Sequence, residues 1–439
     1  MPNDAPLKML RWAYLPECEE PPDGWRVTPF LAFAKVIAGQ SPSSETYNDK
    51  GIGLPFLQGN ADFSFKYPIP NLWCSSPHKI ARKGDTLISV RAPVGEVNRA
   101  DQDYAIGRGL AAIRSNSNSD FLYHALQRWR RCLQRVAQGT TFDAITASHF
   151  AHLYIAVPPP EEQAAIAQVL DAVDMAIERA IEAIKCARQL RESLLADLLI
   201  RGIGSNGKVR NLDRSPDQFV QTPLGHLPSE WKLSSVGKEF DLQTGFTLNE
   251  SRRPKYRKRL YLRVANVQRD FLDLENVQEL EASDAEFAPR ALKYDDLLVV
   301  EGHADRMQIG RCARVTEDAE GMTFQNHLFR LRANNEVIPS FGCLWLNSAY
   351  AQQYWNARCA TSSGLNTINQ RMLKRLIIPV PPEPEQQTIT EVVAAQRTHL
   401  EALTSKHKCL VSLKTSLMHD LLTGKVRVRH LYLDSMVKI

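Results

Sequence analysis

The chain repeats part of itself, and this internal repeat constrains its fold more than any other feature. Residues 145–170 align without gaps on residues 368–393, a shift of 223 positions, and 10 of the 26 residues are identical. The same shift places residues 186–199 on 409–422, with 7 of 14 residues identical. A fixed period of this kind indicates two copies of one structural unit.

Upstream of this fixed part the repeat is looser. Trp25 aligns with Trp231 at a shift of 206, and Asp85 aligns with Asp296 at 211. Each copy thus combines a variable part of about 130 residues with a fixed part of about 55. Loops tolerate insertions, whereas a helix held in register against a partner excludes them.

The fixed parts are predicted to be two long helices. Prolines followed by acidic residues open each one, as expected at the positive end of a helix. Apolar residues then recur at steps of three and four, which is a heptad pattern. The heptad positions are Ile166, Leu170, Val173, Ile177, Ala180, Ile184 and Ala187 in the first copy, and Ile389, Val393, Gln396, Leu400, Leu403, His407 and Leu410 in the second. Small residues in one stripe match large ones in the other, which favours two stripes that face each other. The alternative is that each stripe packs onto its own globular domain.

The variable parts mix strand and helix signals. Short β-like runs occur at residues 86–90, 297–300 and 327–331, and helical patterns cover 120–137 and 340–358. Residues 202–228 are rich in Gly, Ser, Asn, Asp and Pro and are predicted to form an exposed linker.

The composition is that of a soluble globular protein, with 44% hydrophobic and 23% charged residues. The net charge of +5 is too small to indicate a nucleic-acid partner by itself. The sequence has no apolar run long enough for a transmembrane helix and no signal-peptide pattern at its start. Its eight cysteines are scattered without a CxxC pair, so we expect a reducing cytoplasm rather than disulfides or a zinc ribbon.

One segment carries a strong local charge. Residues 250–263 contain seven basic residues against Glu250 alone, with two tyrosines interleaved. Such a cluster can neutralise phosphates, and its guanidinium groups can bind guanine edges. A solvated loop is the alternative, but seven unpaired charges would repel one another without an anionic partner. The DNA-binding candidates of this segment are Arg252, Arg253, Lys255, Tyr256, Arg257, Lys258, Arg259 and Arg263.

Further candidates are amide and arginine side chains in both copies. Gln58 and Asn60 correspond approximately to Arg263 and Asn266, and amides are suited to adenine. Arginines on the helical stretch 127–135 form a second basic cluster, for which a solvated helix face is the alternative. The additional candidates are Gln58, Asn60, Arg91, Arg128, Arg130, Arg131, Asn266, Gln325 and Asn326.

Three features together resemble the specificity (S) subunits of type I restriction–modification systems. The domain openings at residues 22–25 and 224–231 are alike, and so are the closing patterns at 139–163 and 362–386, each ending in Pro-Pro-x-x-x-Gln. The third feature is the twofold domain–helix order. The first copy departs from the family pattern at residues 140–143.

The resemblance implies an α+β protein with two target recognition domains, related by a pseudo-twofold axis and separated by two long antiparallel helices. It also implies a non-catalytic subunit that reads a bipartite, asymmetric site in double-stranded DNA. Two modification (methyltransferase) subunits and restriction (endonuclease) subunits would be its partners. S-adenosylmethionine, ATP and Mg would bind in those partners, not in this chain. The expected helix and partner interface comprises Ile166, Leu170, Val173, Ile177, Ile184, Leu400, Leu403 and Leu410.

This organisation predicts six segments. They are a first recognition domain (1–160), a first helix (161–202), a linker (203–224), a second recognition domain (225–383), a second helix (384–424) and a tail (425–439).

Two other functions are each suggested by one feature of the sequence or by the helices alone. A nucleotide-binding enzyme is suggested by residues 202–208, which fit both G-x-G-x-x-G and G-x-x-x-x-G-K, but these motifs need a preceding strand and a following helix. His149 and His152 have the spacing of metal ligands, but Met372 and Arg375 take their places in the second copy. No adenine-methyltransferase or nuclease motif is present, so we expect no catalytic and no metal-binding residues. A scaffold that binds only proteins is the second alternative.

Overall fold

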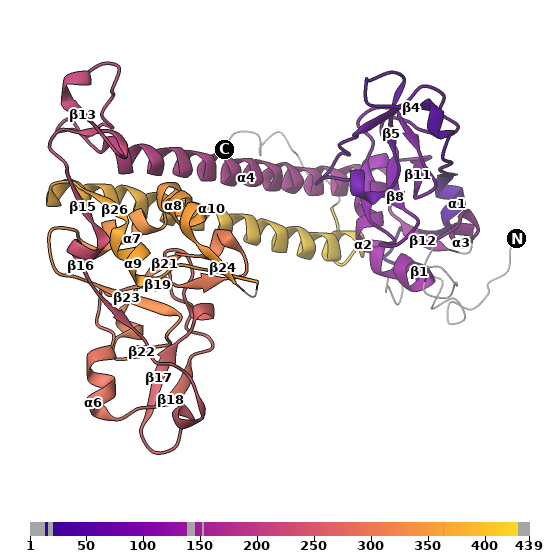
Figure 1. Cartoon of the computed structure of the whole chain (residues 1–439). Coiled ribbons are helices and arrows are strands. Elements are labelled where there is room, and N and C mark those ends of the chain that lie inside the picture. Colours follow the sequence, from indigo (N-terminus) through magenta and orange to yellow (C-terminus); the bar gives the residue numbers. More distant parts are fainter. Residues whose placement is uncertain (1–13, 16–20, 138–144, 152, 363, 429–439) are drawn as a thin grey trace, which may run out of the picture. The chain divides into compact units, whose positions relative to one another are not determined.

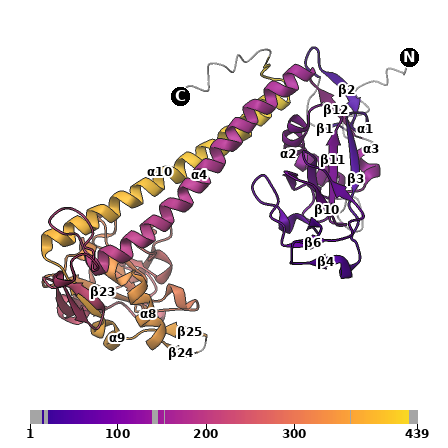
Figure 2. The same ribbon diagram turned by 90° about the horizontal axis from the view of Figure 1, so that it is seen from above.

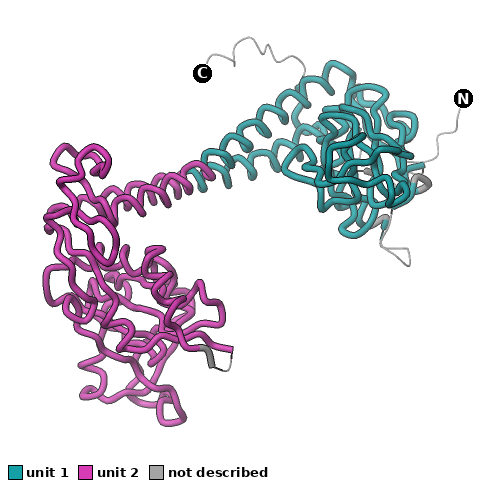
Figure 3. Tube along the Cα trace, turned by 45° about the horizontal axis from the view of Figure 1, so that its top comes forward, with its two compact units in different colours: residues 1–183, 403–439 teal, residues 184–402 magenta. Residues whose placement is uncertain are grey.

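The computed structural model describes residues 14–15, 21–137, 145–151, 153–362 and 364–428. The chain forms two compact units, residues 1–183 with 403–439 and residues 184–402 (Figure 3). Each unit combines one variable part with one half of each long helix. The departure from the family pattern at residues 140–143 lies outside the described residues, as do parts of the predicted first domain and tail.

The fixed parts form the two long helices α4 (Pro160–Arg201) and α10 (Glu383–Leu422), with 42 and 40 residues. In the first unit, Leu170 of α4 shares a buried core with Leu421 of α10. Further along α4, the Asp174 carboxylate lies 2.7 Å from the ammonium of Lys414, which precedes Leu421 in α10. The helix halves of this unit therefore run antiparallel, side by side (Figure 2).

The same antiparallel arrangement recurs in the second unit. Here Leu198 and Leu199 of α4 share a core with Ile389 and Val393 of α10. Just beyond α4, the backbone N–H of Ile203 donates to a Glu385 carboxylate oxygen near the start of α10, at 2.8 Å. The end of one helix thus lies beside the start of the other.

The predicted heptad stripe is the least exposed face of both helices. Ile166, Leu170 and Ile177 are fully buried. The half-buried positions of the predicted interface are Val173, Ile184, Leu400, Leu403 and Leu410. Ile166 and Leu170 also contact the core of the first variable part, where Phe121 lies. The helix ends therefore pack both against each other and against a domain. The stripes facing each other and the stripes packing onto a globular domain are thus both part of the structure.

The variable part of the first unit is built on two sheets (Figure 1). One is antiparallel with the order β3-β11-β8-β9, and the other has the order β4-β6-β5-β10-β7. A third, small sheet has the order β1-β12-β2 and leads into α4. The strands are β1 (Tyr14–Leu15), β2 (Arg26–Pro29), β3 (Ala34–Ala38), β4 (Tyr47–Asn48), β5 (Leu54–Leu57), β6 (Leu72–Cys74), β7 (Ile80–Ala81), β8 (Thr86–Ser89), β9 (Val97–Arg99), β10 (Tyr104–Ile106), β11 (Leu110–Ser115) and β12 (Tyr154–Val157), and the helices are α1 (Phe30–Phe33), α2 (Ser119–Ala137) and α3 (Ala147–Ala151).

The variable part of the second unit repeats this plan. Its antiparallel sheet β16-β23-β19-β21 matches β3-β11-β8-β9, and its sheet β18-β17-β22 contains a parallel pair like that of β5 and β10. The strands are β13 (Phe219–Thr222), β14 (Gly225–Pro228), β15 (Lys232–Ser235), β16 (Phe240–Thr244), β17 (Lys258–Leu262), β18 (Gln278–Glu281), β19 (Leu297–Val300), β20 (Gly302–His303), β21 (Cys312–Arg314), β22 (Thr323–Phe324), β23 (Leu328–Ala333), β24 (Ala360–Ser362), β25 (Leu365–Thr367) and β26 (Ile377–Val380), and the helices are α5 (Val236–Glu239), α6 (Asp284–Phe287), α7 (Pro339–Leu346), α8 (Ala349–Arg358) and α9 (Gln370–Arg375).

A buried ion pair confirms the loose alignment of Asp85 with Asp296. Asp85 accepts two hydrogen bonds from Arg114, at 2.8 and 2.7 Å. Asp296 accepts two from Arg332, at 2.7 and 2.6 Å. Both aspartates are almost completely buried. In each copy an arginine that donates two hydrogen bonds compensates the buried negative charge.

Two local predictions are confirmed only in part. The helix predicted over 340–358 is broken between α7 and α8, because the Asn347 amide bonds to the backbone of Cys312 and Ser348 caps the next helix. The segment 202–228 is not a fully exposed linker. Its strands β13 and β14 form a hairpin, and Leu224 and Leu227 are buried.

The buried helix stripe predicts unequal effects of leucine substitutions on one helix. Leu170→Ala should lower the free energy of unfolding by about 2–5 kcal/mol, because it leaves a cavity at a fully buried site. Leu190→Ala, at a position 58% exposed, should change it by less than about 0.5 kcal/mol. Urea unfolding followed by circular dichroism measures both, and equal effects would contradict the packing described.

Candidate nucleic-acid interface and helix joints

The basic segment 250–263 forms a short 3-10 turn, a loop and strand β17. Antiparallel pairing brings the acidic strand β18 alongside β17, and α6 follows β18. The resulting ion pairs are Arg252–Glu286, Lys258–Glu279 and Arg259–Asp284, while Arg253 pairs with Glu250. Four of the seven charges that were predicted to be unpaired are therefore paired, mainly because acids come from a neighbouring strand and helix.

The tip of this segment is held in place by one carboxylate. The backbone N–H groups of Lys255, Tyr256 and Arg257 all donate to Glu281, at 2.7, 2.9 and 2.8 Å. Desolvation would raise the pKa of Glu281, but these three hydrogen bonds outweigh it and hold the pKa below its usual range. Tyr256 is 94% exposed. Among the described residues, no carboxylate lies within 4 Å of the Lys255 ammonium or the Arg257 guanidinium.

Arg263 and the two amide candidates Gln325 and Asn326 lie together at the carboxyl ends of the parallel strands β17 and β22. The Gln325 N–H donates to Leu262 at 3.0 Å, which links the two strand ends. The side-chain amides of Gln325 and Asn326 make no hydrogen bond to other residues that the structure describes, so they remain able to bind base edges.

Asn266 does not share this freedom. Its side chain is 3% exposed, its amide oxygen accepts from the Arg263 N–H at 2.9 Å, and its amide nitrogen donates to Asp273 at 2.8 Å. These bonds fix the turn after β17. The structure therefore removes Asn266 from the DNA-binding candidates.

In the first domain, Gln58 occupies the place of Arg263, directly after β5. Its N–H donates to the Asp62 carboxylate at 2.8 Å, as that of Arg263 donates to Asn266. The equivalent of Asn266 is therefore Asp62, and Asn60 only begins the 3-10 turn between them. Gln58 is exposed, and so is Arg91 in the loop after β8.

The arginines of α2 are weaker candidates. Phe121, Leu122, Leu126 and Trp129 bury one face of this helix in the domain core. On the other face Arg130 pairs with Glu96, Arg128 is half-buried and Arg131 is exposed. This pattern favours the solvated helix face as the explanation for this cluster.

Each long helix begins at a buried carboxylate that the sequence analysis did not single out. Glu162 accepts a hydrogen bond from the Trp25 indole N–H at 3.1 Å and two from Arg427 at 2.7 and 2.8 Å. Burial alone would raise the pKa of Glu162, but the hydrogen bonds from Arg427 and Trp25 outweigh it and hold this pKa below its usual range. These three residues are the first helix joint.

The second helix joint consists of Trp231, Glu385 and Arg210. The Trp231 indole donates to Glu385 at 3.0 Å, and both terminal nitrogens of Arg210 donate to the same carboxylate. In each joint the arginine follows the end of one long helix and the glutamate starts the other. The tryptophans and glutamates lie at repeated positions, which is the sequence signal that could have identified them.

The glutamine after each joint glutamate is also structural. Gln163 donates to the Pro158 carbonyl and Gln386 to the Pro381 carbonyl, both at 2.9 Å. Both glutamines are almost completely buried. The Pro-Pro-x-x-x-Gln pattern therefore specifies how the chain turns into each helix.

The glycine-rich segment 202–208 lacks the setting of a phosphate-binding loop. It follows α4 rather than a strand, and a β-bridge between Ile203 and Val209 closes it. Gly202 ends the helix with φ +63°, and an added Cβ would lie 2.1 Å from Glu385. The segment therefore ends α4, and the missing side chain of Gly202 leaves space for the Glu385 carboxylate of the second joint.

One domain family matches both copies of the repeat. The type I restriction modification DNA specificity domain matches the chain at residues 22–185 and again at 228–406. The chain belongs to this family. It thus carries two DNA specificity domains, and the alternatives of a protein-only scaffold and a nucleotide-binding enzyme find no support. Among the described residues, no helix is long and apolar enough to cross a membrane.

Individual relatives agree with this membership. A protein of Methanocaldococcus jannaschii named as the MjaX specificity subunit of a type I restriction enzyme is 43% identical over 37% of this chain, which spans 39% of that relative. The EcoKI specificity subunit of Escherichia coli is 20% identical over 85% of this chain and 82% of its own. A solved S subunit from M. genitalium, 17% identical, covers 90% of this chain and 96% of its own with a TM-score of 0.55, which supports the fold.

The first helix joint predicts a specific loss of stability. Glu162→Gln should lower the free energy of unfolding at pH 7 by roughly 2–3 kcal/mol, because Arg427 loses its carboxylate while the shape of the side chain is kept. Since the folded-state pKa of Glu162 is depressed, its contribution is present above about pH 4.3 and disappears as the pH falls through the folded pKa. The difference between wild type and variant should therefore shrink in acid.

Glu336→Gln is the matched control for this substitution. Glu336 forms an ion pair with Lys232 in which the side chains are 50% and 69% exposed. Its removal should cost less than about 1 kcal/mol. Urea titrations of both variants at neutral and acidic pH provide the comparison, and a Glu162→Gln effect as small as the control would refute the joint.

Proposed function

We propose that this chain is the non-catalytic, DNA-reading subunit of a type I restriction–modification complex, and that it recognises a bipartite, asymmetric target. Each recognition domain reads one half of the target. The domains are related by a pseudo-twofold axis, and α4 with α10 forms the antiparallel spacer between them. The observation that carries this proposal is the duplicated helix joint, since it ties one domain to one pair of helix ends in each unit.

Different side chains in the two domains support an asymmetric target. In the second domain the exposed loop tip at Lys255–Arg257 offers two cations and an aromatic ring, and Gln325 and Asn326 offer amides. In the first domain Gln58 and Arg91 are exposed at related loops. Cations contact phosphates of any sequence, whereas amides and guanidinium groups distinguish base edges.

The same proposal includes the partners. Exposed apolar side chains on the two long helices, at Met175, Ile181, Leu190, Val411 and Leu413, provide surface for the two methyltransferase subunits. The restriction subunits join that complex in the cytoplasm. S-adenosylmethionine, ATP and Mg bind in those partners.

Domain exchange tests the proposal. Replacing residues 225–380 by the corresponding domain of a relative should change one half of the methylated motif and leave the other half and the spacer unchanged. Long-read sequencing of modified bases, in a host that expresses the chain with its methyltransferase, measures the motif. If both halves changed together, the domains would not read separately.

The exposed loop tip makes a second prediction. Changing both Lys255 and Arg257 to alanine should lower the slope of log K against log salt by about 1.8, because each lost phosphate contact removes about 0.9. The control Lys232→Ala, which removes an exposed ion pair on β15, should leave the slope unchanged. Titration of cognate duplex at several salt concentrations measures the slope. An unchanged slope in the double variant would show that this loop is solvated and does not contact DNA phosphates.

A further inference from the structure

The loops that follow β5 and β17 have the same backbone structure in the two copies. A hydrogen bond between backbone groups closes each loop, from Ile69 to Asp62 in the first and from Asp273 to Asn266 in the second, both at 2.8 Å. The corresponding ends of the two bonds are 204 residues apart along the chain. This constant offset makes the two loops equivalent residue by residue between these bonds.

The offset places an exposed aromatic side chain at the same position of both loops. Tyr67 corresponds to Phe271, and these side chains are 38% and 57% exposed. Each loop begins directly after its parallel strand, at the DNA-binding candidates Gln58 and Arg263. The aromatic ring therefore belongs to the loop that is proposed to read bases.

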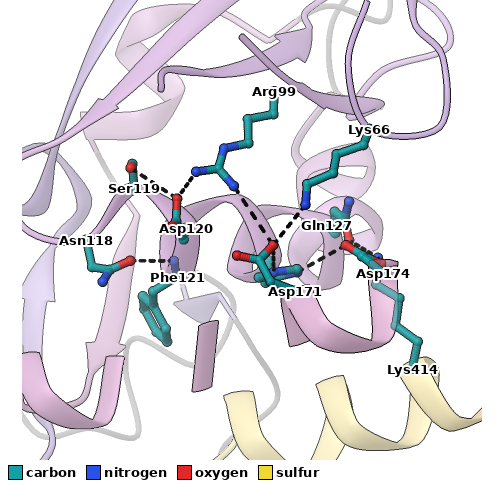
Figure 4. A network of polar contacts seen from close by, with 11 residues as sticks. Lys66, Arg99, Asn118, Ser119, Asp120, Phe121, Gln127, Asp171, Asp174 and Lys414 are labelled. Carbon is teal, nitrogen blue, oxygen red and sulfur yellow. Dashed lines mark hydrogen bonds and ion pairs between the residues drawn. The ribbon is translucent and has the colours of Figure 1, made fainter. Parts of the chain in front are cut away.

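The residue before each aromatic ring fixes its loop to α4. The Lys66 ammonium lies 3.2 Å from the Asp171 carboxylate (Figure 4), and the Lys66 carbonyl accepts the N–H of Arg99 at 2.9 Å. In the second loop the Asp270 carboxylate lies 3.2 Å from the Arg191 guanidinium. An ion pair with the long helix thus holds each ring in place, although the helix supplies the acid in one copy and the base in the other.

The turn at Asp270 is held by further contacts. Asp270 has a left-handed φ of +69°, a conformation that a residue with a side chain keeps only where its surroundings hold it there. Its N–H donates to the Cys312 carbonyl at 3.0 Å, and its second carboxylate oxygen accepts from Asn347 at 2.8 Å. Because the turn is fixed in advance, Phe271 loses little conformational freedom when it inserts into a partner.

Two arginines at this turn indicate that the partner is anionic. Arg311 is almost completely buried and donates only to neutral groups, the carbonyls of Val264 and Val267 and the side chain of Gln308. Arg269 donates to the Met307 carbonyl and to the side-chain amides of Asn347 and Gln352. Within the part of the chain that the structure describes, neither guanidinium has a carboxylate within 4 Å.

The two positive charges also repel each other. Burial lowers the pKa of both arginines, and Asp270 and Asp305 oppose this effect only in part at Arg269. Arg269 lowers the pKa of Arg311 further, because two neighbouring cations destabilise each other. A partner that carries negative charge would relieve this repulsion. A nucleic acid offers such charge on its phosphates, together with stacked bases that accept an aromatic ring.

We propose that Phe271 and Tyr67 are wedges that enter the stack of DNA bases, one in each half of the target. Apolar side chains such as Phe and Leu open base steps in this way. A methyltransferase must turn its target base out of the duplex, and unstacking that base costs free energy. A wedge beside the target base lowers this cost for the methyltransferase. The inference rests on the proposed function and extends it, because the subunit that reads the target then also prepares the base for reaction.

Phe271→Ala tests the inference in the complex of this chain with its methyltransferase. The domain exchange described above assigns the half of the motif that the second domain reads. 2-Aminopurine placed beside the target base of that half fluoresces when the stack opens. Phe271→Ala should reduce this fluorescence severalfold and slow methylation of that half by roughly tenfold, because the methyltransferase must then open the stack unaided. Phe271→Leu should retain most of both signals, since leucine is also an effective wedge.

Tyr294→Ala is the matched control, because Tyr294 is 50% exposed in another turn of the same unit. It should change neither the fluorescence nor the methylation rate. The two halves of the motif also serve as controls for each other. Phe271→Ala should leave the half read by the first domain unchanged, and Tyr67→Ala should slow only that half.

A mismatch at the target base distinguishes a wedge from a damaged loop. A mismatched base is already partly unstacked, so it should bring methylation by Phe271→Ala to within about twofold of the wild-type rate on the same duplex. A mismatch would not restore a loop that has lost its structure. The inference is overturned if Phe271→Ala behaves like Tyr294→Ala, or if the mismatch fails to restore its methylation.

A protein contact is the remaining alternative for this ring, and assembly measurements test it. If Phe271→Ala weakens the complex with the methyltransferase in the absence of DNA, the ring contacts that protein and the inference is overturned. A wild-type complex that methylates no bipartite motif would refute the proposed function and the inference with it. Normal methylation by both wild type and Phe271→Ala would refute the inference alone.

Discussion

A buried carboxylate at the start of each long helix is the constraint on which the rest of the structure depends. An isolated carboxylate in this position would cost several kcal/mol, so it needs a hydrogen-bonded cation. Glu162 and Glu385 obtain that cation from an arginine that follows the end of the other helix. Neither helix can therefore start correctly without the end of its partner. The indole donors Trp25 and Trp231, directly before β2 and β15, connect the same carboxylates to these strands.

The helices were predictable because two rigid helices held in register tolerate no insertions, so their two copies align without gaps. A constant shift of 223 residues identified both helices and their buried stripe. The joint arginines were missed because Arg210 and Arg427 are 217 residues apart, so they fall out of that alignment. Their role depends on how the chain folds back after Gly202 and Gly424. A local sequence pattern does not encode this path.

The basic segment was misjudged for a related reason. Local composition showed many cations and one acid, but strand pairing places Glu279 and Glu281 beside them. The set of DNA-binding candidates in this domain is therefore narrower than the sequence suggested, and it comprises the tip around Tyr256 and the amides after β22. Asn266 had the correct residue type for a base contact, but its turn uses both ends of the amide. Local sequence therefore suggested a set of candidates, and long-range pairing reduces that set.

If α4 and α10 hold two independently reading domains apart, as proposed, a matched deletion in both helices should shorten the spacer of the DNA target. Removing one heptad from the middle of each helix, residues 181–187 and 401–407, keeps both stripes in register and shortens the pair by about 10 Å. Methylation mapping should then show both half-sequences retained and a spacer shorter by about three base pairs, at roughly 3.4 Å each. An unchanged spacer in a folded, active complex would contradict the account.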